Sequence, residues 1–220
     1  MNDYQPILKR AGLLMLLLAT LQVAIAVWNF LQHQGTSFNI GLTALVFGAL
    51  LMWGRLGGAE FVRWFAWLTW MAPLLTLYLM LAQPSGLTLA ELRSDAAAYL
   101  CTMTLLLIET AITLCVALQL GQPVVLQARA AEGRKQRRIW IPQALGVAGV
   151  LAGALFSTLM LGGADARHAE ALAASQFGPQ YHYRINSLHV MKSPSGTQVN
   201  ATVMAWNDQS LRAYNVNWRE

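Results

Sequence analysis

The segment "LTLAELRSDAAAYLCTMTLLLIETAITLCVALQL", residues 87–120, decides the fold class of this chain. From Ala97 onward it is almost wholly apolar. It is long enough for one helix to cross a bilayer, which takes about 20 apolar residues. A single acidic residue, Glu109, interrupts this apolar run near its centre. The segment therefore predicts a transmembrane helix that carries a carboxyl group at mid-membrane.

The composition extends this prediction to most of the chain. Of the 220 residues, 56% are hydrophobic and 11% are charged, whereas soluble domains average about 25% charged residues. So few charges cannot cover a water-exposed surface, and we expect the lipid bilayer to surround most of the chain. The net charge of +5 does not indicate a nucleic-acid partner, because the positions of the cations are those of topology signals.

Five segments are predicted to span the membrane: 11–31, 38–53, 61–82, 97–120 and 141–161. The second is short, but it contains no charged residue. The predicted parts of the chain are a four-helix bundle over 1–126, a basic cytoplasmic loop over 127–140, a fifth transmembrane anchor over 141–162 and an extracytoplasmic α+β domain over 163–220.

Positive charges orient these spans. Nine Lys and Arg residues lie before span one, at the join of spans two and three, or between spans four and five, whereas the alternate connections 32–37 and 83–96 carry only Arg93. Cytoplasmic loops are the ones enriched in Lys and Arg. We therefore predict a bacterial inner-membrane protein with a cytoplasmic N-terminus and a periplasmic C-terminal domain. The connection 83–96 is predicted to be a solvated loop.

The loop "QARAAEGRKQRRIW" is the most basic part of the chain, with Arg129, Arg134, Lys135, Arg137 and Arg138. Such a cluster can bind anionic lipid head groups. It can also serve as a topology anchor and linker. Both interpretations place these side chains at the cytoplasmic surface of the membrane.

The fifth span is rich in small residues, including Gly146, Gly149 and Gly153. Small residues let helix backbones approach closely in a membrane. The span can therefore pack against the chain's own bundle, or it can form the seam of a homodimer.

The C-terminal region alternates in a way that predicts a helix followed by three strands. "ADARHAEALAASQFG" reads as an amphipathic helix that Gly178 and Pro179 end. "QYHYRINSLHV", "TQVNATVMAW" and "LRAYNVNWRE" each alternate with period two and are separated by the turn sequences "KSPSG" and "NDQS". We predict an α-β-β-β domain in which the helix covers an antiparallel sheet.

This element order after an anchor helix, together with the segment "FGPQYHYRINSLHV", resembles the Tim21-like domains of respiratory-complex assembly factors. The resemblance covers residues 163–220 and not the preceding spans. It implies a non-catalytic, protein-binding role beside a membrane complex. Another membrane or periplasmic protein is then the expected partner.

The common catalytic and cofactor-binding motifs are absent from the sequence. It contains no phosphate-binding loop, dinucleotide fingerprint, HExxH or CxxC. We therefore expect no catalytic residue, no metal ion and no cofactor, and we do not expect an enzyme.

The intramembrane carboxyl of Glu109 remains the residue that most needs an explanation. An acidic side chain at a helix centre costs roughly 2.5–3.5 kcal/mol on insertion scales, so it should find a polar partner. Thr102 and Thr113 share its helix face, and Gln22 and Thr69 lie at matching depths in other spans. Pro73 should free the carbonyl of Thr69. These residues predict an intramembrane polar cluster in which Glu109 is neutral or bonded to an amide.

Two functional hypotheses follow from this cluster. In the first, Glu109 is a structural clasp, and the protein is a scaffold, assembly or accessory protein that acts through its exported domain. In the second, Glu109 carries protons in a small transporter. Transporters are commonly built from inverted repeats, and no such repeat is visible in the sequence, which favours the first hypothesis.

Overall fold

The computed structural model of the chain describes residues 3–31, 41–54, 56–133, 138–193 and 196–219. It is mostly helical, with one three-stranded antiparallel sheet. The chain divides into two compact units. The first unit contains Met1–Leu74 and Leu105–Gly149, and the second contains Leu75–Thr104 and Val150–Glu220. The predicted domain 163–220 is therefore part of a larger unit that includes segments from the apolar helices.

Four helical segments in the described part of the chain are long and apolar enough to cross a membrane: Gln5–Trp28, Leu56–Leu81, Ser85–Gln119 and Trp140–Leu161. On the last of these, Leu151, Leu155 and Leu159 recur every four residues and are all exposed. A row of exposed leucines on one helix face suits lipid rather than water. The prediction of a helical membrane protein with a small sheet-containing part is confirmed at this level.

The predicted second span, 38–53, is represented by the short helix α2 (Leu42–Met52), and residues 38–40 lie outside the described part. Its 11 residues extend for about 16 Å. This is roughly half of the 30 Å hydrocarbon thickness of a bilayer. α2 therefore differs in kind from the four long segments.

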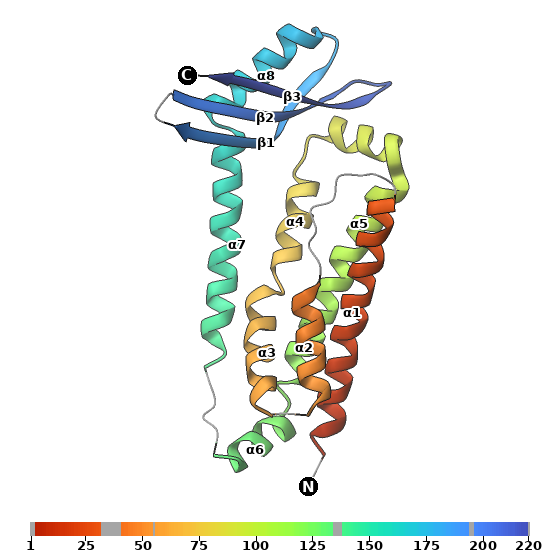
Figure 1. Cartoon of the computed structure of the whole chain (residues 1–220), viewed down its shortest axis with the longest axis vertical. Coiled ribbons are helices and arrows are strands. Elements are labelled where there is room, and N and C mark those ends of the chain that lie inside the picture. Colours follow the sequence, from red (N-terminus) through yellow and green to blue (C-terminus); the bar gives the residue numbers. More distant parts are fainter. Residues whose placement is uncertain (1–2, 32–40, 55, 134–137, 194–195, 220) are drawn as a thin grey trace. The chain divides into compact units, whose positions relative to one another are not determined.

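In the first unit, α1 (Gln5–Leu31) and α2 lie side by side (Figure 1). A Cβ atom at Gly12 would lie 3.0 Å from the carbonyl oxygen of Gly48, so the two glycines permit a close backbone approach. The α1–α2 pair packs on α3 (Leu56–Thr69) and the second half of α5 (Ser85–Gln119). The buried side chains of this core include Leu8, Leu51, Val62, Val116 and Leu120.

The predicted third span is two helices rather than one. α3 ends at Thr69, and α4 (Ala72–Leu81) begins after two turn residues. Pro73 is the second residue of α4, where its missing N–H removes no hydrogen bond but prevents a continuous helix. The sequence predicted that Pro73 would free the carbonyl of Thr69, and the break between α3 and α4 lies between these two residues.

The start of α7 (Trp140–Leu161) bears on the two interpretations of the glycines in the predicted fifth span. A Cβ atom at Gly146 would lie 2.7 Å from the carbonyl oxygen of Leu68, so α7 approaches the backbone of α3 closely. At Gly149 a Cβ atom would meet no atom within 4 Å. Gly146 therefore packs against the chain's own bundle, whereas Gly149 leaves space beside α7.

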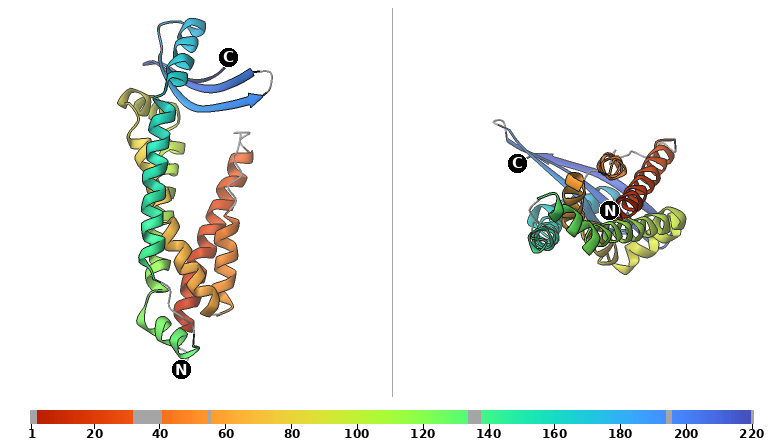
Figure 2. Two further views of the ribbon diagram at one scale, coloured as in Figure 1. Left: turned by 90° about the vertical axis from the view of Figure 1, so that its left-hand side faces the viewer. Right: turned by 90° about the horizontal axis from the view of Figure 1, so that it is seen from below.

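The second unit contains the predicted α-β-β-β arrangement. α8 (Ala164–Phe177) is followed by β1 (His182–Ser193), β2 (Gly196–Trp206) and β3 (Leu211–Arg219), which pair antiparallel in the order β1-β2-β3. Figure 2 shows α8 lying across the sheet.

Small side chains let α8 sit close to the strands of this sheet. Ala166, Ala169 and Ala173 are spaced to share one helix face and are fully buried. They pack with Val203 and Val216 in one apolar cluster. The alternation predicted for 199–205 is confirmed, because Val199, Ala201, Val203 and Ala205 are all buried.

The connection 83–96 was predicted to be a solvated loop, and this prediction is wrong. Ser85–Ser94 is helical, and α5 kinks at Asp95 (φ −154°, ψ 78°). The Asp95 carboxylate accepts a hydrogen bond of 2.9 Å from the Ala98 N–H, as a helix N-cap does. The segment is helical because Leu87 and Ala90 form an apolar face that packs against Trp206.

Candidate functional site

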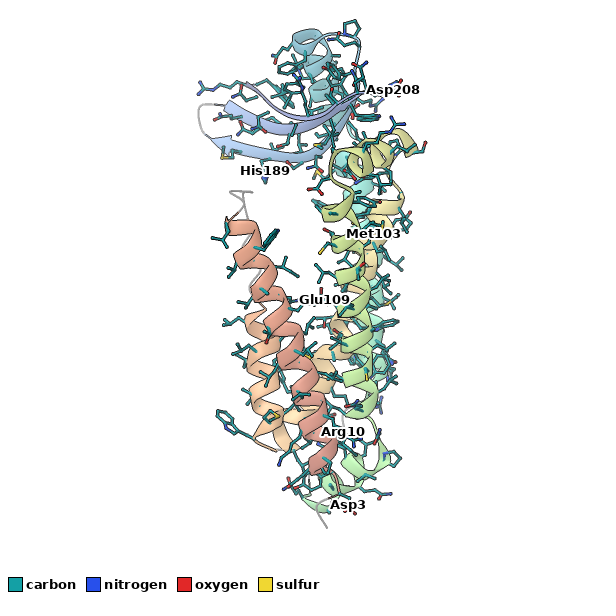
Figure 3. All side chains as sticks on the ribbon, turned by 90° about the vertical axis from the view of Figure 1, so that its right-hand side faces the viewer. Asp3, Arg10, Met103, Glu109, His189 and Asp208 are labelled. Carbon is teal, nitrogen blue, oxygen red and sulfur yellow. The ribbon has the colours of Figure 1, made fainter. Side chains whose placement is uncertain are left out.

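The carboxyl of Glu109 lies on the side of α5 that faces α1 (Figure 3). It is hydrogen-bonded to the side chain of Gln22 on α1. The amide oxygen of Gln22 is directed at Gly41, where a Cβ atom would lie 2.0 Å from it. The amide N–H is therefore the group that donates to Glu109. The sequence analysis left two states open for Glu109, neutral or bonded to an amide. The lack of a side chain at Gly41 provides the space for this arrangement.

The pair borders a cavity of about 350 Å³ within the first unit. Its polar lining residues are Gln22, Thr43, Thr69, Glu109 and Thr113. The others are apolar or small: Met15, Leu18, Gly41, Ala44, Phe47, Phe65 and Ala66. Cavities of roughly 300–1,000 Å³ with an apolar lining and a few polar groups are typical of small-ligand sites.

Two of the threonine hydroxyls that line the cavity, those of Thr69 and Thr113, have already used their protons. Thr69 Oγ1 donates to the Phe65 carbonyl at 3.0 Å, and Thr113 Oγ1 donates to the Glu109 carbonyl at 2.7 Å. A hydroxyl has one proton and two lone pairs. Each of these two hydroxyls therefore offers the cavity acceptor capacity and no donor.

Two helix ends lie at this cavity. α2 begins at Leu42, and its N-cap residue, Gly41, supplies no side-chain hydrogen bond to the first turn. α3 ends at Thr69. Within a membrane, irregular backbone is tolerated where protein buries it or where it lines a cavity. The cavity therefore lies beside the start of α2 and the end of α3.

The structure brings together four of the five residues of the predicted polar cluster. Gln22, Thr69, Glu109 and Thr113 line one cavity. Thr102 is separate: it is exposed, and its hydroxyl donates to the Ala98 carbonyl at 2.9 Å. The prediction for Thr102 is wrong because helical spacing of seven residues keeps a common face but adds roughly 10 Å along the axis.

Sequence reasoning missed other parts of this site. Thr43 and Phe47 come from α2, and no periodic pattern in the sequence indicates that the start of α2 lies beside Gln22. Phe65 packs edge to face on Phe47, with ring centroids 5.0 Å apart. The spacing of Phe47 and Phe65 in the sequence does not indicate this contact.

A second polar cluster lies in the same unit and was not predicted. Glu60, Arg63 and Arg129 are all at least 90% buried. Arg129 donates to Glu60 Oε2, and Arg63 Nη1 lies 3.5 Å from the same oxygen. This cluster ties α3 to α6 (Pro123–Ala131).

The burial of Arg129 contradicts the prediction that its side chain faces lipid from a basic loop. Residues 123–131 form a helix, and Val125 and Arg129 share its buried face at a spacing of four residues. Arg138 is exposed. Arg134, Lys135 and Arg137 lie outside the described residues. The spacing of Glu60 and Arg63 was a local signal for one ion pair, but nothing local connects Arg129 to them.

Within the described residues, no group of three or more His, Cys, Asp and Glu side chains could hold a metal ion. Comparisons with protein-family models, with curated proteins and with solved structures give no match. The class of protein is defined by its fold and its cavity. It is a helical membrane protein with a polar cavity among its apolar helices and a small α+β unit, which is formed by α8 and β1–β3 within the second unit.

Proposed function

We propose that this chain is an integral membrane scaffold, assembly or accessory protein that acts through its α+β unit. Its partner in this proposal is another membrane or periplasmic protein. The observation that carries the proposal is that β1 is an edge strand of the sheet and has exposed apolar side chains near its end.

β1 is an edge strand of twelve residues. At one end its edge is covered, because the Glu170 carboxylate accepts a hydrogen bond of 3.0 Å from the Ile185 N–H. At the other end Val190 and Met191 are 42% and 55% exposed. Proteins normally protect the edges of their sheets, and an extended segment of a partner can add to an open edge. The resemblance of residues 163–220 to Tim21-like domains supports the same role.

The proposed arrangement in the membrane is five spans, with α2 as the short second one. The N-terminus is cytoplasmic and the α+β unit periplasmic in a bacterial inner membrane. The support for this orientation is the bias of Lys and Arg toward alternate connections. A self-association through α7 is compatible with this role, since Gly149 leaves space beside that helix.

Affinity purification in mild detergent tests the scaffold proposal. The wild-type chain should copurify with a partner in constant stoichiometry, and Val190→Lys combined with Met191→Lys should remove that partner. Ala213→Lys, an exposed position on the opposite edge strand β3, is the matched control and should retain it. Retention by the β1 variant, or absence of any stoichiometric partner from the wild-type chain, would contradict the proposal.

Proton-coupled transport is the second candidate, and the cavity beside Glu109 is the observation that favours it. A clasp requires only hydrogen bonding, which a glutamine side chain can supply, whereas proton transfer requires a group that titrates. Glu109→Gln therefore separates the two roles. A folded but inactive Glu109→Gln protein would support transport, and an active one would exclude this role for Glu109.

A further inference from the structure

The charge of the cavity restricts its ligand. Glu109 is the only ionisable side chain among the described residues that line it. A carboxylate without a counter-ion is costly in a low-dielectric site, and a single positive charge would compensate it. A ligand with one positive charge therefore complements this cavity better than an anion or a dication.

The hydrogen-bonding capacity of the lining restricts the ligand further. Thr69 and Thr113 offer only lone pairs, because their protons are bonded to helix carbonyls. The amide N–H of Gln22 is engaged with Glu109, so the carboxylate and these two hydroxyl oxygens present acceptors, and Thr43 adds a third hydroxyl to the lining. A primary ammonium group has three donors and no acceptor. Its donors can therefore bond to the carboxylate and to both of these hydroxyl oxygens.

The rest of the lining requires an apolar body on the ligand. Phe47 and Phe65 form an edge-to-face pair, and Met15, Leu18 and Ala44 extend this apolar surface. Aromatic rings attract both cations and other aromatic groups. The volume of about 350 Å³ is at the lower end of the range for small-ligand cavities.

We propose that the cavity between α1, α2, α3 and α5 binds a small amphipathic primary amine in its ammonium form. The ammonium group is bound by Glu109, Thr69 and Thr113, and the apolar body packs on Phe47 and Phe65. This site goes beyond the scaffold role and does not depend on it, because an amine bound here can be cargo or can stabilise the bundle.

Binding to the full chain in lipid nanodiscs tests this proposal. The probe is 2-phenylethylamine, measured by isothermal titration calorimetry, with empty nanodiscs as the control for partition into lipid. Saturable binding with one site per chain is expected. The neutral 2-phenylethanol has the same apolar body and should bind at least about tenfold more weakly, as expected from loss of a charge-assisted hydrogen bond.

Variants locate the site. Glu109→Gln should weaken binding of the amine by at least about tenfold and leave binding of the alcohol almost unchanged, because only the charge is removed. Thr69→Val removes one acceptor at nearly constant volume and should weaken amine binding about three- to tenfold. Thr102→Val is the matched control outside the cavity and should bind like the wild-type chain.

Several results would overturn the proposal. These are equal binding of the amine and the alcohol, no saturable binding above that of empty nanodiscs, and equal losses in Thr69→Val and Thr102→Val. If Glu109→Gln does not fold, as judged by size-exclusion chromatography, the comparison of the two probes on the wild-type chain still decides the question.

Discussion

Replacing Glu60 by glutamine should destabilise the first unit more than replacing its partner Arg129. Glu60 is the one carboxylate between two guanidinium groups, and all three side chains are buried. At the 3.5 Å that separate Arg63 Nη1 from Glu60 Oε2, two opposite charges attract by roughly 5 kcal/mol at an effective dielectric constant of 20, before desolvation is subtracted. Glu60→Gln removes this attraction for both arginines at once.

The expected loss for Glu60→Gln is about 3–5 kcal/mol of unfolding free energy, because buried charges are left without a counter-ion. Arg129→Met leaves Glu60 paired with Arg63, so no charge loses its last partner. Its loss should be smaller, about 1.5–3 kcal/mol, the range for one hydrogen bond to a charged group. Glu132→Gln, at an exposed position beside α6, is the control and should change the stability by less than about 0.5 kcal/mol.

Reversible unfolding in mixed micelles, followed by circular dichroism, measures these differences. The structure requires that the loss of unfolding free energy be largest for Glu60→Gln, smaller for Arg129→Met and smallest for Glu132→Gln. If Arg129→Met were as damaging as Glu60→Gln, or if Glu60→Gln cost less than about 1 kcal/mol, the charges would not be coupled as described.

Three other predictions follow from the same structure. Val203→Asp places a charge in the fully buried core under α8 and should make the α+β unit sensitive to protease, whereas Asn200→Asp on the neighbouring stretch of β2 should not. Gln22→Leu and Glu109→Leu should each cost on the order of 1 kcal/mol, and the double variant should lose less than the sum because the two side chains are hydrogen-bonded. In fusion proteins, a reporter at the C-terminus should be active only outside the cytoplasm, and one placed after Gly133 only inside it; a cytoplasmic C-terminus would contradict the five-span arrangement.

Much of the fold follows from local patterns. The apolar runs predicted the four long helical segments of the described part of the chain. A membrane-spanning helix needs only enough apolar residues in succession. The alternation of 199–205 predicted which side of β2 is buried, because successive side chains of a strand point to opposite faces. The similar depths of Gln22 and Glu109 also followed, since position along each apolar run can be counted from its ends.

The tertiary structure decided which distant segments meet. Arg129 belongs by composition to a basic loop, and only the packing of α6 on α3 pairs it with Glu60. Ser85–Ser94 lies between two predicted spans and was expected to be a loop. Its apolar face becomes buried only because it packs against Trp206, which is distant in the sequence.

The cavity beside Glu109 depends on where α2 begins and where α3 ends. The sequence by itself determined the long apolar segments, the alternation of β2 and the carboxyl within an apolar run, because these depend on neighbouring residues alone. The partners of buried charges and the shape of the cavity were decided only in the folded chain, because close packing depends on side chains that are far apart in the sequence.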